Sequence, residues 1–419
     1  MIKAGSLFYA IVISLIIAIV SSSLILFAYL THIQFESFEI NQRLQLNSDS
    51  GINLLLSRQS LVGINEAKTI DLFREGTDSV NLTRKSWGAY EVVISEAIFK
   101  NSSFIRMAQV GYYSDTSERY SLYLADEDRA LGLCGRTVIK GLAYLPKQGA
   151  KRTYIEGENF VGRQLVQGNI KQSKRTIPVI RQEFIDNIQS VCRGQQITDS
   201  VVFIDNELSE DSLSNSFLLP TLVLNAGGPL RISSGFYSGN IVILSKQIIR
   251  IAPNATLENI IISAPKVIVE KGFIGNLQIF ASDSVILEED VTLSYPSVIG
   301  LLRDERSPVC AAIVLNKNDT VAGNIFAYKK ETDVLKQAAI TIDYKSMVYG
   351  QIYSSGHVDV KGTLYGSLMC TKILLKTSSS SYDNQLLNAV IDVSKLSTYF
   401  VGIDLVETSV VRRVVKWLN

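Results

Sequence analysis

The stretch Tyr349–Lys376 reads YGQIYSSGHVDVKGTLYGSLMCTKILLK, and it decides which fold class the sequence predicts. A pattern of Gly, a polar residue and an aliphatic residue occurs in it at Gly350 and again, about 16 residues later, at Gly366. One coil of a parallel β-helix takes about 16 to 22 residues and cannot bury its inner face alone. The stretch therefore predicts successive coils of a β-solenoid.

The same pattern recurs upstream, which predicts further coils over residues 221–377. Aliphatic pairs such as Ile241/Ile243 and Val267/Val269 alternate with other residues, as the inward positions of a strand must. We expect Gly where φ is positive or stacked backbones come close, and Asn where side-chain amides hydrogen-bond between coils. The wider intervals leave room for an extra coil or a lateral loop. The turn positions of the repeat are Gly239, Asn240, Asn259, Gly275, Asn276, Gly323, Asn324, Gly350 and Gly366.

The alternative for this region is an antiparallel β-sandwich with coincidental Gly-Asn turns. Hairpin turns would rarely repeat one motif at one interval, so the solenoid is the favoured interpretation. The cadence of Tyr349–Lys376 is also similar to that of bactofilin-type polymer-forming domains. This resemblance implies a small right-handed β-helix that can polymerise end to end. The chain departs from that family in carrying an apolar N-terminal segment and an intervening domain.

The N-terminal segment predicts one transmembrane helix. No charged residue lies between Ala4 and Gln34, and Ser6–Leu30 would form roughly 38 Å of helix, enough to cross a hydrocarbon core about 30 Å thick. A cleaved secretory signal is the alternative, but the apolar run is too long and lacks a cleavage motif after Ser23. Lys3 precedes the helix, which favours a cytoplasmic N-terminus with the bulk of the chain periplasmic or extracellular. Apolar residues at helical spacing extend the expected helix to Ser57.

A second resemblance rests on Met1–Gly5, followed by Ser6 and an unbroken apolar helix. This arrangement resembles type IV pilin-like proteins, including minor pseudopilins. The resemblance implies a prepilin peptidase that cuts after Gly5, makes Ser6 the first mature residue, and releases a helix that packs into a filament. The family's usual glutamate would fall on Ala10 and is missing. A plain signal-anchor helix is the alternative interpretation.

Between the helix and the solenoid, residues 58–220 predict a small mixed α/β domain. Tyr120–Leu124 is strand-like, and Gln182–Cys192 has its apolar residues on one helical face. A basic cluster over residues 147–175 is expected to be a solvated face rather than a nucleic-acid site. The last segment, 378–419, is expected to cap the solenoid through a helix over Val406–Leu418 whose Arg412, Arg413 and Lys416 face water.

The expected organisation is therefore mainly β with an N-terminal transmembrane α-helix. Residues 1–57 form the anchor, 58–220 the mixed α/β domain, 221–377 a right-handed parallel β-helix and 378–419 the cap. With 47% hydrophobic residues and a net charge of +1, the composition indicates a folded chain without a global attraction to nucleic acid. The predicted partners are the lipid bilayer, through residues 6–30, and a homo-oligomer or a pilus- or secretion-type assembly.

The four cysteines are far apart and form no metal-binding or redox motif. In an exported protein they permit disulfides within each domain, Cys134 with Cys192 and Cys310 with Cys370, and buried free thiols are the alternative. We expect no catalytic, cofactor or metal site, because the acids Glu288, Glu289 and Asp290 are best read as a solvated turn and His357 as structural.

The sequence thus predicts a non-enzymatic, membrane-anchored structural protein of the cell envelope, which presents a surface for self-association or partner docking. The alternative is a membrane-tethered β-helix that binds or cleaves carbohydrate. That alternative predicts a groove lined by exposed aromatic residues and paired acids along the stacked coils.

Overall fold

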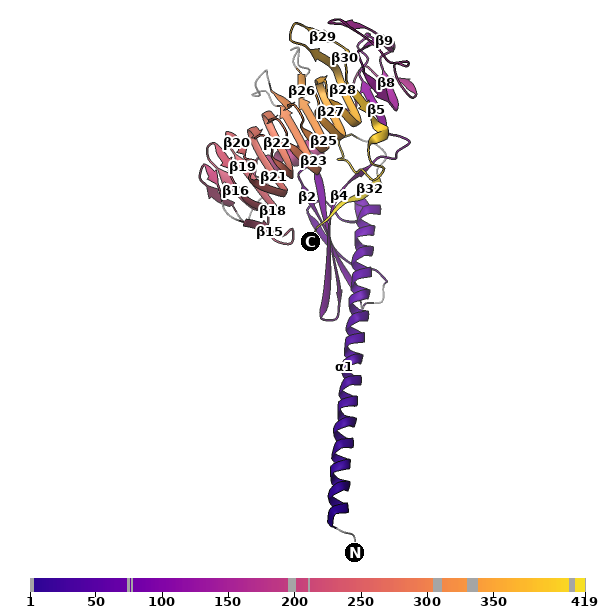
Figure 1. Cartoon of the computed structure of the whole chain (residues 1–419), viewed down its shortest axis with the longest axis vertical. Coiled ribbons are helices and arrows are strands. Elements are labelled where there is room, and N and C mark those ends of the chain that lie inside the picture. Colours follow the sequence, from indigo (N-terminus) through magenta and orange to yellow (C-terminus); the bar gives the residue numbers. More distant parts are fainter. Residues whose placement is uncertain are drawn as a thin grey trace. The chain divides into compact units, whose positions relative to one another are not determined.

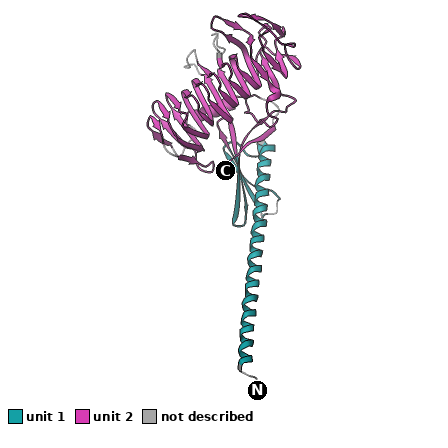
Figure 2. Cartoon of the chain, in the orientation of Figure 1, with its two compact units in different colours: residues 1–84, 93–107 teal, residues 85–92, 108–419 magenta. Residues whose placement is uncertain are grey.

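The computed structural model describes residues 4–73, 76, 78–194, 201–209, 212–303, 311–329, 338–406 and 411–418. It is mainly β, with one long N-terminal helix (Figure 1). The chain divides into two compact units, one of residues 1–84 and 93–107 and the other of residues 85–92 and 108–419 (Figure 2). These boundaries differ from the four domains expected from the sequence.

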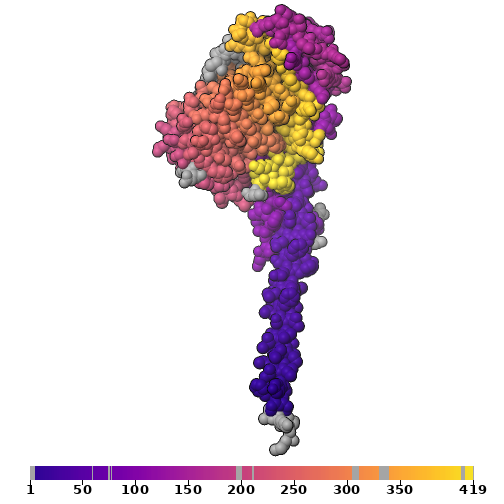
Figure 3. Space-filling model, in the orientation of Figure 1, coloured from indigo at the N-terminus to yellow at the C-terminus, as the bar shows by residue number. Residues whose placement is uncertain are grey.

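Helix α1 (Ala4–Ser57) is one continuous element of 54 residues, as the sequence predicts. Among the described residues it is the one helix long and apolar enough to cross a membrane. Its most apolar window is 0% buried, and nearly all of the large apolar side chains from Leu7 to Leu30 are exposed (Figure 3). At 1.5 Å per residue the helix is about 81 Å long, more than twice the thickness of a hydrocarbon core.

The C-terminal part of α1 packs on strands of the first unit. Leu44, Ile52 and Leu55 are buried, and a Cβ at Gly51 would lie 2.8 Å from the Leu82 side chain. The strand side chains therefore leave no room for a larger residue at Gly51. Beside this contact, the buried Asp78 carboxylate accepts hydrogen bonds from Arg43 at 2.7 Å and Asn47 at 3.0 Å.

The strands next to α1 form a five-stranded sheet in the order β1-β2-β3-β4-β32. Their bounds are β1 (Glu66–Asp71), β2 (Asp78–Trp87), β3 (Tyr90–Phe99), β4 (Ser102–Tyr113) and β32 (Val411–Leu418), and a 3-10 turn (Gln59–Leu61) precedes them. β1 and β2 pair antiparallel.

The C-terminal segment corrects one prediction, because β32 is a strand and not a helix. The valines of this segment are spaced as on a helix, but β-branched residues also favour strands. Pairing in the five-stranded sheet decides for the strand. Arg412 is buried rather than facing water, and it donates to Glu91 at 2.8 Å and to the Tyr112 hydroxyl at 2.7 Å. Residues 407–410 of the expected helix lie outside the described residues.

The remaining strands build the second unit, together with α2 (Gln182–Cys192), which is the helix that the sequence predicts, and a 3-10 turn (Val393–Lys395). Before α2 they are β5 (Tyr120–Leu124), β6 (Leu131–Cys134), β7 (Val138–Lys140), β8 (Leu142–Leu145), β9 (Ala150–Arg152), β10 (Tyr154–Ile155), β11 (Glu158–Asn159) and β12 (Ile170–Gln172). After α2 they are β13 (Val201–Ile204), β14 (Glu207–Leu208), β15 (Ser212–Asn215), β16 (Leu222–Ala226), β17 (Leu230–Ile232), β18 (Gly235–Gly239), β19 (Ile241–Ser245), β20 (Ile248–Ile251), β21 (Ala255–Val269), β22 (Ile274–Leu287), β23 (Thr292–Arg303), β24 (Ala312–Leu315), β25 (Thr320–Lys329), β26 (Ala338–Ile342), β27 (Met347–Val360), β28 (Thr363–Lys376), β29 (Ser381–Asp383), β30 (Gln385–Leu387) and β31 (Val390–Asp392).

These strands lie side by side in a large stacked sheet (Figure 1). Successive layers pair in parallel along β13, β16, β19, β21, β22, β23, β25, β27 and β28. One register position shows the core clearly, because Ile243, Ile262, Ile279, Ile299 and Ile325 are successive partners and all are fully buried. Parallel pairing of this kind excludes the antiparallel sandwich.

The stack continues with residues from much earlier in the chain. β5 pairs in parallel with β28, β7 with β31, and β6 with β30. β8 then pairs with β5, and β12 pairs with β8. Residues 120–172 are therefore layers of the stacked sheet, and the residues expected to form a separate domain over 58–220 belong to two different units.

Glycines of the repeat lie in register. Gly323 pairs with Gly350, which pairs with Gly366, and a Cβ on Gly350 or Gly366 would collide with the carbonyl oxygen of the preceding glycine. Ser297 of β23 is the partner of Gly323, so the wide interval between Gly275 and Gly323 holds an extra layer. Asn240 donates to the Leu219 carbonyl and Asn276 accepts from the Asn259 amide, whereas Asn324 donates to the Tyr90 hydroxyl.

Candidate functional site

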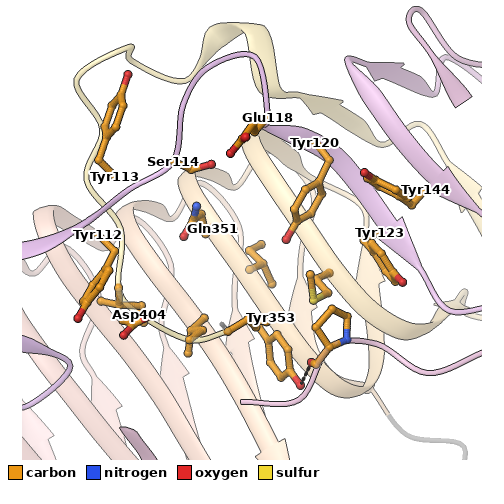
Figure 4. Close-up of a pocket in the computed structure, with 16 residues that line it drawn as sticks. Tyr112, Tyr113, Ser114, Glu118, Tyr120, Tyr123, Tyr144, Gln351, Tyr353 and Asp404 are labelled. Atoms are coloured by element: carbon orange, nitrogen blue, oxygen red, sulfur yellow. Dashed lines mark hydrogen bonds between the residues drawn. The ribbon is translucent and has the colours of Figure 1, made fainter. Parts of the chain in front are cut away.

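The second unit contains a pocket of about 320 Å³ whose wall is rich in tyrosine. Its residues come from the end of β4, the following loop, β5, β8, β27, β28 and the segment 403–406. Figure 4 shows the side chains that line it. The tyrosines are Tyr112, Tyr113, Tyr120, Tyr123, Tyr144 and Tyr353.

The register of four neighbouring strands determines which side chains form part of the pocket wall. Tyr353, Met369, Tyr123 and Tyr144 are successive partners across β27, β28, β5 and β8. Each neighbouring position along these strands faces the core, as Leu122 and Leu124 do on either side of Tyr123. Since side chains alternate between the faces of a strand, this row must point outward. The outward row is therefore aromatic where the inward row is aliphatic.

The tyrosine rings contact one another closely. Tyr123 and Tyr144 are stacked with centroids 5.1 Å apart, and Tyr120 meets them edge-on at 6.3 and 6.2 Å. The Tyr353 hydroxyl donates to the Pro178 carbonyl at 3.0 Å, and the Tyr123 hydroxyl accepts from the Lys174 amide at 3.2 Å. These contacts hold the rings in place without a ligand, so the wall is pre-formed.

The loop 114–119 forms one edge of the pocket and is held by a buried arginine. Arg119 donates to the carbonyl oxygens of Ser114 at 3.1 Å, Ser397 at 2.7 Å and Phe400 at 3.2 Å. With the Thr398 carbonyl at 3.4 Å, four carbonyl acceptors from two segments order the loop, which carries Glu118 to the pocket.

On the opposite edge, the Asp404 carboxylate lines the pocket and forms an ion pair with Arg181. Burial raises the pKa of Asp404 above its ordinary value, and Arg181 opposes this rise. Burial also raises the pKa values of Tyr120 and Tyr353, so both hydroxyls stay protonated at neutral pH and can donate hydrogen bonds.

The predicted site residues lie elsewhere and do not come together with the pocket. Gly5 and Ser6 lie on exposed helix α1, and the repeat glycines and asparagines lie within strands of the stacked sheet, except Asn240, which lies between β18 and β19. Cys134, Cys192 and Cys370 are free thiols, so the Cys134–Cys192 disulfide is not formed, and Cys310 lies outside the described residues. Burial raises the pKa of Cys192 to about 11 and that of Cys370 further, which keeps both as unreactive thiols.

The acids considered from the sequence have structural partners. Lys271 bridges Glu289 at 3.1 Å and Asp290 at 3.3 Å, and Lys361 lies 3.4 Å from buried Asp359. Within the described ranges there is no group of three or more His, Cys, Asp or Glu side chains that could hold a metal ion.

Sequence reasoning missed the pocket, although it identified Tyr120–Leu124 as a strand. The available indication was the alternation in that strand, with Leu122 and Leu124 inward and Tyr123 outward. Its partners Met369 and Tyr353 come from the far end of the chain, and no local pattern connects them.

Comparison with known proteins gives no relative to guide the assignment: no family model, curated protein or solved structure matches this chain.

Proposed function

We propose that this chain is a non-enzymatic, membrane-anchored structural protein of the cell envelope, with a pilin-like N-terminal helix and a right-handed parallel β-helix displayed outside the cytoplasm. The observation that carries the proposal is the division of α1 into two parts. Its N-terminal part is apolar and exposed, whereas its C-terminal part is buried against the strands of the first unit. A helix of this design can occupy lipid or a filament core while it holds a folded unit outside.

Two features support the pilin-like version. The first is the sequence Met1–Gly5 ahead of the apolar segment, and the second is the packing of the end of α1 on strands β2 and β3, where Ser48 donates to the Ser95 carbonyl at 2.8 Å. The buried Asp78 with Arg43 and Asn47 ties the helix to the same strands. The missing glutamate at Ala10 is the departure from the family pattern.

The β-helix version of the second unit is supported by its pairing. Consecutive layers pair in parallel, glycines stack in register, and the aliphatic ladder fills the interior. Right-handedness follows from the strong preference of parallel connections for that hand. The bactofilin-like cadence of Tyr349–Lys376 falls on β27 and β28, two adjacent layers.

Processing at Gly5 tests the pilin-like version. The full chain is expressed with and without a prepilin peptidase, and its N-terminus is sequenced after purification. We expect Ser6 as the new N-terminus with the peptidase, and a Gly5→Leu variant should stay uncut. Retention of Met1 in both samples would remove the pilin-like version and leave a plain signal-anchor. External protease on intact cells then tests the topology, because it should digest the second unit only if that unit lies outside.

The two ends of the stacked sheet suggest how copies associate. At one end of the sheet, β13 pairs with β16 on one side, and no described strand pairs with it on the other. Its side chains Val201, Val202 and Phe203 are exposed, and Phe203 is 79% exposed. Exposed acids Asp205 and Glu207 follow. Edge strands of this kind are templates for pairing with another chain.

The opposite end carries the basic cluster that the sequence singled out. β12 and β9 are its outermost strands in the described part of the chain, and Lys151, Arg152 and Lys171 on them are exposed. An acidic edge at one end and a basic edge at the other favour head-to-tail association of identical chains, which grows into a filament if it does not close.

Charge reversal tests this association on the full chain in lipid nanodiscs. We expect wild-type oligomers that dissociate as salt rises, and weaker association for Asp205→Lys and for Lys151→Glu alone. A mixture of the two variants should restore a mixed dimer, measured by sedimentation velocity. A wild-type chain that stays monomeric at every concentration would contradict self-association.

A further inference from the structure

The outward row that contains the pocket tyrosines extends well beyond the pocket. Its successive partners are Phe280, Gly300, Phe326, Tyr353, Met369, Tyr123, Tyr144 and Lys171. One half of this row carries phenylalanine, and the other half carries tyrosine. The change of residue type coincides with a change in what covers the row.

Helix α2 covers the phenylalanine half. Phe184 of α2 packs edge-on against Phe326 at 5.5 Å, and Phe280 and Phe326 are buried to 1% and 0% exposure. Just before the helix, the Pro178 carbonyl accepts a hydrogen bond from the Tyr353 hydroxyl, and Pro178 lines the pocket. The tyrosine half is left open as the pocket. Tyrosine suits such a surface because its ring is apolar and its hydroxyl can pair with a ligand.

Two polar groups in the pocket are available to a ligand. Tyr120 and Gln351 both extend into it (Figure 4). Across the described part of the chain, neither the Tyr120 hydroxyl nor the Gln351 side-chain amide has a hydrogen-bond partner. The Tyr120 hydroxyl can donate, and the amide can both donate and accept. A ligand with several hydroxyl groups could satisfy both.

The charge of the pocket restricts the ligand further. Its two lining acids are Glu118 and Asp404, and Asp404 forms an ion pair with Arg181. Lys171 lies at the end of the row, 5.8 Å from the centre of the Tyr144 ring. No Lys or Arg of the described residues lines the pocket, whereas two carboxylates do, so the pocket would repel an anionic sugar.

We propose that this tyrosine-lined pocket binds a neutral oligosaccharide. The C–H face of a sugar ring packs on Tyr144, and the sugar's hydroxyl groups pair with Tyr120, Gln351 and the carboxylate of Glu118. The volume of about 320 Å³ lies at the small end of the range for ligand pockets and suits a short segment of a glycan. The proposal depends on the pocket and not on the anchor, so it stands if the pilin-like proposal fails.

The test is calorimetric titration of the full chain in a lipid nanodisc, because detergents with sugar head groups would compete. The probes are maltotriose, cellotriose and N-acetylchitotriose as neutral sugars, trigalacturonic acid as an anionic sugar, and decaproline as a peptide. We expect saturable binding of at least one neutral trisaccharide and at least tenfold weaker binding of trigalacturonic acid.

Variants locate the binding in the pocket. Tyr144→Ala and Gln351→Leu should each weaken binding by about tenfold, and Tyr120→Phe, which removes one hydroxyl, by about threefold to tenfold. Tyr399→Ala is the matched control, because Tyr399 is 82% exposed and does not line the pocket, so it should bind like wild type. Melting temperatures close to that of wild type for all four variants separate lost binding from lost folding.

Three outcomes would overturn the proposal: no binding of any neutral sugar, equal loss in Tyr399→Ala, or binding of decaproline alone, which would assign the pocket to a proline-rich peptide. Cleavage of a bound trisaccharide, followed by chromatography, would support the pocket and overturn the non-enzymatic function instead.

Discussion

Gly350 lies where the backbones of two layers meet. Its φ of +155° and the carbonyl oxygen of Gly323 leave no room for a side chain. Gly350→Ala should lower the free energy of unfolding by about 3 kcal/mol, through backbone strain and the steric clash. Chemical denaturation of the full chain, followed by circular dichroism, measures this change.

Gly227→Ala is the matched control for Gly350→Ala, because nothing lies within 4 Å of a Cβ there. It should change the free energy of unfolding by less than about 0.5 kcal/mol. Equal loss in both variants would contradict the role assigned to the stacked glycines.

Asp319 makes stability depend on pH in the neutral range. It is fully buried, and burial raises the pKa of its carboxyl from 3.8 to about 7. Between pH 3.8 and about pH 7, Asp319 is protonated in the folded chain and ionised in the unfolded chain. The free energy of unfolding therefore falls as the pH rises towards 7, and it stays low above pH 7. The melting temperature should therefore be lower at pH 8 than at pH 6.

Asp319→Asn removes the ionisable group and should reduce this difference in melting temperature. The variant also loses one acceptor, because the carboxylate accepts from both the Val291 and Asn316 amides, so its stability should be lower at pH 6. Asp205→Asn, at an exposed position, serves as the control. An unchanged difference between pH 6 and pH 8 in Asp319→Asn would refute the assignment.

At the scale of elements, α2 covers the phenylalanine half of the outward row through Phe184, Ile185, Ile188 and Val191. Phe184→Ala should cost about 3 kcal/mol of unfolding free energy, and local unfolding of α2 should speed trypsin cleavage after Arg193, which lies just beyond the helix. Limited proteolysis with mass spectrometry measures this cleavage. Glu183→Gln, on the exposed side of the same helix, should leave the cleavage rate unchanged, and a comparable rise in both variants would contradict the packing role.

Elements differed in how readily the sequence predicted them. α2 was predicted at its observed bounds, because its apolar residues share one helical face. β32 was predicted wrongly, because valines at helical spacing also suit a strand and only its sheet neighbour decides. The inward Ile and Val ladder was predictable because alternation is a local property of each strand.

At the scale of the whole molecule, the placement of residues 120–172 was beyond prediction. Ser367 of β28 donates to the Tyr120 carbonyl at 2.6 Å, although the two residues are 247 positions apart. No periodic pattern carries that pairing. The pocket was hidden for the same reason, since its tyrosines come from β4, β5 and β8 in the first half of the chain and from β27 in the second half.

A truncated chain tests this long-range pairing. A chain ending at Gly362 lacks β28 and should leave residues 120–172 open to protease, whereas a chain ending at Val406 keeps β28 to β31 and should leave them protected. Protection of residues 120–172 in the shorter chain would show that these layers fold on their own and would contradict the dependence on β28.

The pairing of β5 with β28 also orders events during biosynthesis. Residues 120–172 leave the ribosome early, yet the strand that they must join is among the last to be made. They wait as exposed apolar chain for most of translation, which makes maturation slow and sensitive to aggregation. Residues 120–172 can therefore reach their native pairing only after β28 has been synthesised.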